Sequence, residues 1–238
     1  KNFFGDDFYT LTFGQAIKDG LLADYEVVIQ LVTDKEIRKK INQRENISLE
    51  NSDFNDIDAE TLATLASLIK TIDKYSLKKI LTFHNKIEQA KYFSKYLQEL
   101  YLQKFLNPNL EPKFIKHIQA KGMTVSKRTQ IISDFRKLDN NNTGIISNAK
   151  CLNEGVDVKE IDCVAFIEPK ESQIDIVQAV GRAIRPKNQS DKKGIIYIPV
   201  FVDENVDVEE NISSTRFKKI CDVLKAIRDH DNVLEEEL

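Results

Sequence analysis

The hydrophobic positions of this chain follow two alternating periods. Short apolar runs of strand length lie at 24–32, 80–83, 113–118, 144–147, 163–167 and 194–200. Apolar residues recur at the three- and four-residue spacing of a helix over 61–74, 86–102, 127–138 and 174–184. Strands that alternate with helices predict an α/β fold, in which helices cover both faces of a parallel sheet. We expect the first of these strands at the sheet edge and the last to close the sheet.

The segments outside this alternation are more polar. Residues 13–17 suit a short helix that stops near Gly20, and 34–58 is a polar insertion with several asparagines. An acidic loop at 206–211 precedes a final amphipathic helix at 216–227. We therefore divide the chain into a connector with a first strand, a polar insertion with a helix, the α/β domain, and a helical extension: 1–34, 35–75, 76–205 and 206–238.

Composition and charge fit a soluble domain of cytoplasmic location. No apolar run approaches the roughly 20 residues that span a bilayer, and no signal peptide opens the chain, so no membrane partner is expected. The three cysteines and three histidines are widely spaced, which predicts neither disulfides nor a metal cluster. A net charge of −3 differs from that of a domain whose whole surface grips nucleic acid, but it does not exclude contacts through backbone amides and hydroxyls.

The segment 178–186 places a glutamine and two arginines at helical spacing. Gln178, Arg182 and Arg185 fall at i, i+4 and i+7, which stacks them on one helix face. Gly181 has no side chain, so another surface can approach beside Arg182. Guanidinium groups match phosphate oxygens, so this face suits a triphosphate; the alternative is a solvated arginine face. A separate apolar stripe is expected to anchor the helix: Val177, Val180 and Ile184.

Four landmarks, in the same order and spacing, resemble those of superfamily 2 helicases and translocases. They are motif IV at 79–85, motif IVa at 122–136, motif V at 147–158 and motif VI at 178–185. Residues 161–169 are similar to the strand and loop that separate the last two motifs in that family. The resemblance covers about half the chain. It is strongest to predicted helicases and to the motor subunits of type I and type III restriction enzymes.

The resemblance implies a RecA-like domain, the second of the two that form such a motor. No glycine is followed by lysine, so the chain contains no phosphate-binding loop. We therefore expect ATP and Mg²⁺ to be held largely by an N-terminal RecA-like domain of the same parent chain, with this domain inactive alone. A start at Lys1 rather than methionine favours a portion of a longer polypeptide.

By resemblance, five residues would face ATP. Gly155 and Asp157 of motif V would meet the ribose, although Asp157 could instead cap a local turn. In motif VI, Gln178 would sense the γ-phosphate or the attacking water. Arg182 and Arg185 would act as arginine fingers, with Arg185 the first choice. Arg182 could alternatively pair with a carboxylate of the partner domain. Gly181 is grouped with the cofactor-binding residues because it permits close approach.

Nucleic acid is the second expected partner, and DNA is favoured over RNA. Backbone amides at His84 and Asn85 open a helix after the motif IV strand and could bind a phosphate. His84 could equally be a structural histidine. Thr124 or Ser126 caps the next helix beside a second set of free amides, and Ser147 supplies a hydroxyl at the start of motif V.

Two other classes of function compete with the motor. Asp162 followed by Glu168-Pro-Lys170 mimics the acidic triad of a metal-dependent nuclease. A RecA-like half could also serve as a non-catalytic binding module for nucleic acid or protein, although such a scaffold has no need of ATP-facing arginines. The Asp203-Glu204 pair ends a hydrophobic strand like a metal site, but it follows motif VI instead of preceding the landmarks.

Overall fold

The computed structural model describes residues 13–19, 22–33, 59–102, 112–139, 141–149, 161–183, 193–202 and 216–236. Six strands form one sheet: β1 (Tyr25–Thr33), β2 (Lys79–His84), β3 (Phe114–Gln119), β4 (Gly144–Ala149), β5 (Cys163–Phe166) and β6 (Gly194–Val202). The described residues also form six helices: α1 (Phe13–Lys18), α3 (Ala59–Lys74), α4 (Ile87–Leu102), α5 (Val125–Arg136), α6 (Gln173–Ala183) and α8 (Lys218–Glu236).

All strand pairs are parallel, in the order β1-β6-β5-β2-β4-β3. The expected α/β class and the expected edge position of β1 are confirmed. The expectation that the last strand closes the sheet is wrong, because β6 lies inside it, between β5 and β1. The apolar composition of β6 fits this position, since an interior strand of a parallel sheet is buried on both faces.

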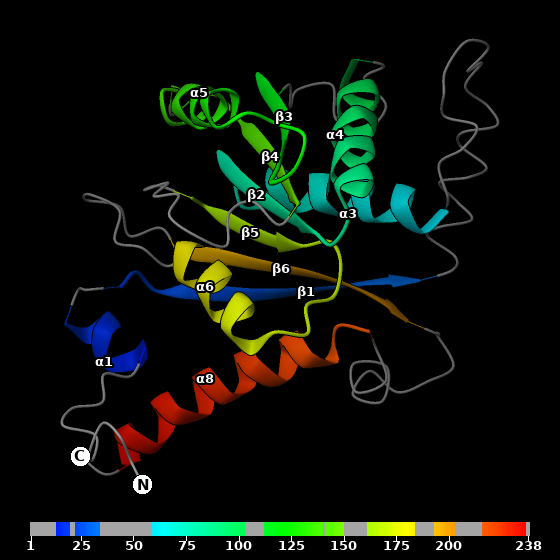
Figure 1. Cartoon of the computed structure of the whole chain (residues 1–238). Helices are drawn as coiled ribbons and strands as arrows, with labels where there is room; N and C mark the ends of the chain where they lie inside the picture. The colour runs from blue at the N-terminus through cyan, green and yellow to red at the C-terminus, as the bar shows by residue number, and fades with distance from the viewer. Residues whose placement is uncertain are drawn as a thin grey trace, which may run out of the picture.

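Helices cover both faces of the sheet (Figure 1). On one face, α5 packs on β3, and α6 packs on β5 and β6 and against α8. On the other face, α4 packs across β2, β4 and β3, while α3 packs on β1 and β6. Side chains alternate between the two cores along each strand: Leu81 and Ile146 join the α6-side core, and Ile80 and Ile145 join the α4-side core.

The helix boundaries agree with the apolar spacing to within a few residues, except that α8 continues to Glu236. Thr124 is the N-cap of α5 and its side chain accepts a hydrogen bond from the Lys127 amide, so the cap prediction is confirmed for Thr124 and not for Ser126. Among the described helices, none combines the length and apolar character needed to cross a membrane. The segments 34–58 and 206–211 and the Asp203-Glu204 pair lie outside the described residues.

The four-part division of the chain stays a prediction. Helix α3, which we grouped with the polar insertion, contributes several residues to the α4-side core. Its Ser67 hydroxyl bonds the hydroxyl of Tyr197 on β6 at 2.5 Å, within the buried interior. Helix α3 is therefore packed as an integral layer of the sheet domain.

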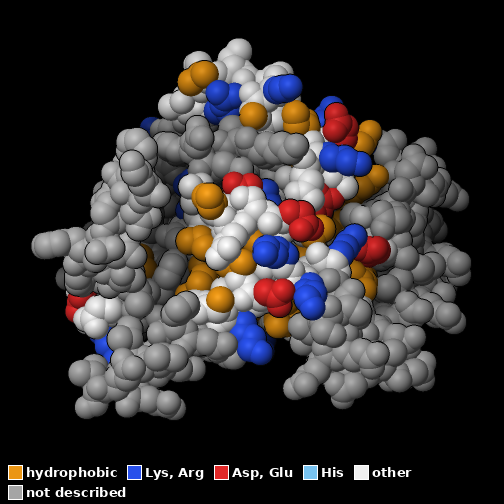
Figure 2. Space-filling view, turned by 60° about the horizontal axis from the view of Figure 1, so that its bottom comes forward, with side chains coloured by type: hydrophobic (Ala, Val, Ile, Leu, Met, Phe, Trp, Pro, Cys, Tyr) orange, Lys and Arg blue, Asp and Glu red, His pale blue; other side chains and the backbone are white. Residues whose placement is uncertain are grey.

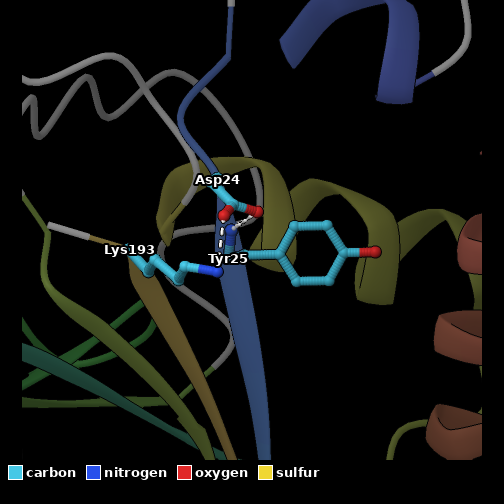
Figure 3. Close-up of polar contacts among 3 residues, drawn as sticks. All are labelled: Asp24, Tyr25 and Lys193. Atoms are coloured by element: carbon cyan, nitrogen blue, oxygen red, sulfur yellow. Dashed lines mark hydrogen bonds and ion pairs between the residues drawn. The ribbon is translucent and has the colours of Figure 1, made fainter. Parts of the chain in front are cut away.

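A surface ion pair joins the starts of β1 and β6. Asp24 lies 2.7 Å from the Lys193 ammonium group and also accepts a hydrogen bond from the Tyr25 amide at 2.8 Å (Figure 3). The Lys193 contact lowers the pKa of Asp24, and the carboxylate in turn raises the pKa of Lys193. The Gly194 amide donates to the Asp24 carbonyl at 2.8 Å, so backbone pairing begins directly beside the ion pair.

The end of α6 contacts the start of β6 without space for a side chain. A Cβ added at Gly194 would lie 2.3 Å from the Ala183 carbonyl oxygen and 2.8 Å from its carbon. Both atoms belong to the backbone, so a side chain here would force α6 away from the sheet. In contrast, a Cβ added at Gly181 in the same helix would meet nothing within 4 Å.

We predict opposite effects on stability for two glycine substitutions. Gly194→Ala should lower the free energy of unfolding by about 1–3 kcal/mol because it overpacks a backbone contact. Gly181→Ala should raise it by about 0.5–1 kcal/mol because alanine favours helix and the space is open. Urea denaturation of both variants measures this. If both substitutions changed the free energy of unfolding equally, the contact between α6 and β6 would not limit the position of the helix.

Candidate functional site: the carboxyl edge of the sheet and the α6 face

The junction between β2 and α4 is tied to the loop that follows β5. The Asn85 amide donates to the Glu168 carboxylate, and the Asn85 side-chain amide donates to the Pro169 carbonyl at 2.9 Å. The Lys170 ammonium group lies 5.7 Å from the centre of the Phe83 ring in the same region. Because β2 and β5 are neighbours, these bonds join two loops at the carboxyl edge of the sheet, where ligands bind in open α/β folds.

His84, the last residue of β2, is only 1% exposed. Its Nε2 lies 2.9 Å from the Thr82 hydroxyl, and its ring centre lies 4.9 Å from that of Phe93 on α4. Burial, with a smaller effect from the Lys170 charge, lowers the pKa of His84 to about 3. The imidazole is therefore neutral at physiological pH, in the geometry of the structural histidine that the sequence left as an alternative.

Ser147 lies in register with Thr82 on β2 and with His117 on β3. Residues two positions earlier on β2 and β4 belong to the α4-side core, so this polar row faces α4 near the carboxyl edge. The Ser147 hydroxyl is fully buried and makes no hydrogen bond within the described part of the chain. A buried hydroxyl without a partner costs free energy, so Ser147 is an unsatisfied polar group in the interior of the domain.

Arg128, a residue that the sequence did not single out, fixes the conformation of the loop from β3 to α5. Arg128 donates to the carbonyls of Ala120 and Met123 at 2.9 and 3.0 Å. Gly122 adopts a φ of 78°, which glycine favours. Thr124 and Ser126 are both exposed at the start of α5, at the same edge as Asn85 and Ser147. Only the fold reveals Arg128, because its partners precede it in an irregular loop.

Helix α6 carries the described part of motif VI. Gln178 is exposed, but Arg182 is only 8% exposed, and desolvation lowers the pKa of its guanidinium. Gln178 and Arg182 therefore do not share one open face, because the Arg182 side chain is buried and that of Gln178 is exposed. Of the expected anchoring stripe, Val180 is buried and Val177 is partly buried against the core. Ile176, Ala179 and Ala183 are buried as well, so the apolar face of α6 is wider than expected. Gly155, Asp157, Ile184 and Arg185 lie outside the described residues.

The structure separates the candidates into two groups. His84, Asn85, Thr124, Ser126 and Ser147 lie along the carboxyl edge. Arg182 lies at the far end of α6, because the next residue, Ala183, contacts the start of β6. The two groups are therefore near opposite edges of the sheet.

The nuclease hypothesis does not agree with this geometry. Asp162 precedes the four-residue strand β5, where its carboxylate accepts the Lys78 and Lys79 amides at 2.8 and 2.9 Å. Glu168 follows the same strand. At about 3.3 Å per residue, the strand holds the two carboxylates too far apart for one metal ion. Within the described residues, no group of three His, Cys, Asp or Glu side chains could hold a metal ion.

Charge is mixed on the face that carries α8. Figure 2 shows basic and acidic side chains interspersed there, with hydrophobic side chains between them. Such a surface lacks the one-signed field with which a basic face attracts nucleic acid.

The fold and the site define a parallel α/β domain of the RecA-like kind, whose polar groups gather where the strands end. Residues 61–187, more than half of the chain, match the family described as the helicase conserved C-terminal domain. The chain belongs to this family.

Individual proteins support the same assignment. Probable helicase A859L of African swine fever virus (isolate Tick/Malawi/Lil 20-1/1983) is 22% identical over 241 residues, which cover 100% of this chain and 24% of the relative. The chain thus spans about a quarter of that relative's length.

Solved structures share the fold. The ATP-dependent Type ISP restriction-modification enzyme LlaBIII, bound to DNA, matches with a TM-score of 0.71 and 23% identity, over 93% of this chain and 15% of that one. A fragment of a putative HsdR subunit of a type I restriction enzyme from Vibrio vulnificus YJ016 matches with a TM-score of 0.56 and 20% identity. The match covers 82% of this chain and 35% of that one. The expected likeness to restriction-enzyme motors is confirmed at the level of the fold.

We predict that the His84 imidazole stays neutral at pH values well below those at which histidine usually gains a proton. Its folded pKa of about 3 lies below the unfolded value near 6.5, so the unfolded chain gains a proton that the folded chain does not. Stability should therefore fall as the pH drops from 6.5 towards 3. NMR titration of the imidazole should show no transition above pH 4, and a midpoint near 6.5 would contradict the buried geometry. His84→Gln should flatten the pH dependence of unfolding more than the control His117→Gln.

We also predict a contrast within the polar row. Thr82→Ala should lower the free energy of unfolding by about 1 kcal/mol because it leaves His84 without its partner. Ser147→Ala should leave stability unchanged or raise it, but weaken single-stranded DNA binding about 2- to 10-fold if the hydroxyl bonds a phosphate. Denaturation and fluorescence anisotropy measure the two effects. A Ser147→Ala variant that loses stability and keeps full affinity would remove Ser147 from the site.

Proposed function

We propose that this chain is the C-terminal motor half of an ATP-dependent DNA helicase or translocase. The observation that carries the proposal is the separation of two surfaces on one rigid domain. One is the carboxyl edge, with Ser147, Asn85 and the start of α5; the other is the exposed part of α6 around Gln178. A motor needs both, because it must bind a strand in one place and complete an ATP site in another.

The residues of α6 fit a nucleotide brought by a second domain. Space is open beside Gly181, and Gln178 is exposed on the preceding turn. ATP with Mg²⁺ supplies the phosphoryl group whose transfer drives the motor, and an N-terminal RecA-like domain would hold most of it. In this proposal Gln178 orients the attacking water, and Arg185 stabilises charge that develops on the phosphoryl group. Arg182, being largely buried, holds the end of α6 or pairs with a carboxylate of the partner domain.

The motif V residues complete the proposed nucleotide contacts. Gly155 lets the backbone approach the ribose, and Asp157 accepts a hydrogen bond from a ribose hydroxyl. Both follow β4, which ends at Ala149 and carries Ser147 and Asn148 just before that end. One short segment would then join the DNA-binding edge to the bound ATP. Such a connection suits a motor whose affinity for DNA changes between its ATP-bound and ATP-free states.

On the nucleic-acid side, phosphates would lie along the carboxyl edge. The start of α5 presents backbone amides, whereas at the start of α4 the Asn85 amide donates to Glu168 and would have to exchange that bond for a phosphate. Ser147, whose hydroxyl is buried without a bond, lies between them. DNA is the favoured track because LlaBIII, which shares the fold, is described as bound to DNA. A non-catalytic binding module would use this edge alone, so the measurement that decides between the two concerns ATP.

We predict that Arg185→Ala in the full-length protein lowers DNA-stimulated ATP hydrolysis by about 10³- to 10⁵-fold and largely preserves ATP binding. The lost cation acts on charge present mainly in the transition state, so binding of the ground state is affected less. Arg136→Ala is the matched control, because Arg136 is an exposed arginine at the end of α5 and should leave the rate unchanged. Steady-state turnover and equilibrium nucleotide binding measure the two quantities.

An unchanged rate in the Arg185→Ala variant would remove Arg185 from the ATP site. DNA binding by a wild-type protein that hydrolyses no ATP would favour the non-catalytic module. The ratio of hydrolysis rates with single-stranded DNA and with RNA of the same sequence tests the choice of track.

A further inference from the structure

A pocket of about 490 Å³ opens between α3, α4 and the loop after β5, and none of the functions above uses it. It lies at the carboxyl edge, because His84 ends β2 and Glu168 follows β5, and both line it. Its volume falls in the range of about 300–1,000 Å³ that small-ligand sites occupy. Asn85, the first residue after His84, is one of the proposed phosphate-binding positions, so the pocket adjoins the proposed strand path.

One stripe of α4 forms an aromatic wall of this pocket. Gln89, Tyr92 and Tyr96 lie three and four positions apart, so they share a helix face. The Tyr92 and Tyr96 rings are close to parallel, with centres 6.2 Å apart and an angle of 21° between their planes. Tyr92 is 53% exposed, although Tyr96 beneath it is buried. An exposed ring backed by a second ring is a ready surface for another flat group.

The charges of the pocket favour an uncharged occupant. Arg216 at its rim pairs with Glu60, and His84 is held neutral by burial. Glu168 remains as an acidic group, and it accepts the Asn85 amide. A phosphate would be repelled here. A neutral ring with amino and carbonyl groups could bond to Glu168 and to the Gln89 amide, which both donates and accepts.

We propose that this pocket binds an unpaired nucleobase of the DNA strand whose phosphates follow the carboxyl edge, with the base stacked on Tyr92. The inference rests on the proposed function. A nucleobase fits better than an aromatic side chain of a protein, because its edge offers hydrogen-bonding groups to Glu168 and Gln89. Stacking tolerates any base, so the contact adds affinity and leaves sequence preference to the polar groups.

The test compares two oligonucleotides with the same phosphates, one with bases and one with abasic residues, on the full-length protein. Tyr92→Ala should weaken binding of the base-bearing strand about 5- to 100-fold and leave the abasic strand unaffected. Tyr92→Phe should bind like the wild type because it keeps the ring. Tyr75→Ala is the matched control, since Tyr75 bonds Glu26 at the opposite edge of the sheet. Fluorescence anisotropy gives the affinities, and thermal unfolding confirms that each variant is folded.

A second measurement locates the base directly. 2-Aminopurine, a fluorescent base, is placed at successive positions of the DNA strand. At one position its fluorescence should be quenched on binding to the wild type and to Tyr92→Phe, and the quenching should be absent with Tyr92→Ala. Gln89→Ala should change the ratio of affinities for different homopolymers. If Tyr92→Ala lost affinity equally for the base-bearing and the abasic oligonucleotide, or for neither, the proposed base-binding role of the pocket would be wrong.

The two proposals fail in different ways. A wild-type protein that binds no DNA would overturn both. A wild-type protein that shows DNA-stimulated ATP hydrolysis, with no base-dependent loss in Tyr92→Ala, would overturn the pocket alone.

Discussion

Parallel pairing of all six strands is the constraint on which the other features depend. Parallel strands require a crossover after each strand, so the helices must return over the faces of the sheet. Every strand then ends at one edge, and α4, α5 and α6 all begin beyond that edge. Backbone amides, strand-end hydroxyls and loop carboxylates are therefore concentrated there. A chain of net charge −3 can offer a phosphate-binding edge for this reason.

The same constraint explains why the two proposed sites are separate. Helix α6 starts at the carboxyl edge and runs back for eleven residues, about 16 Å at 1.5 Å per residue, so Arg182 reaches the opposite edge. The tight contact between Ala183 and Gly194 fixes that end against the start of β6. The contact thus holds Arg182 at a fixed distance from the carboxyl edge, where α6 begins.

Periodicity along the chain predicted the elements, because it reports local burial: the strand 80–83 and the helix 61–74 appear almost as expected. It could not give the position of β6, since strand order depends on pairing between distant segments. The burial of Arg182 was missed for a related reason: helical spacing places it on the face of Gln178, but its exposure depends on packing with segments distant in the sequence. The pocket beside Tyr92 could not be predicted from the sequence, because the residues that line it are far apart in the chain and range from Glu60 to Arg216.

The bonds from Asn85 to Glu168 and Pro169 have a consequence for how the halves of the domain act together. They tie the start of α4, where a phosphate and a base would bind, to the loop that leads into α6. That loop is short, and α6 begins at Gln173 and carries Gln178 at mid-length. A bound strand that shifts Asn85 must either break these bonds or move the start of α6 with it. These bonds therefore link the carboxyl edge to the start of the helix that carries Gln178.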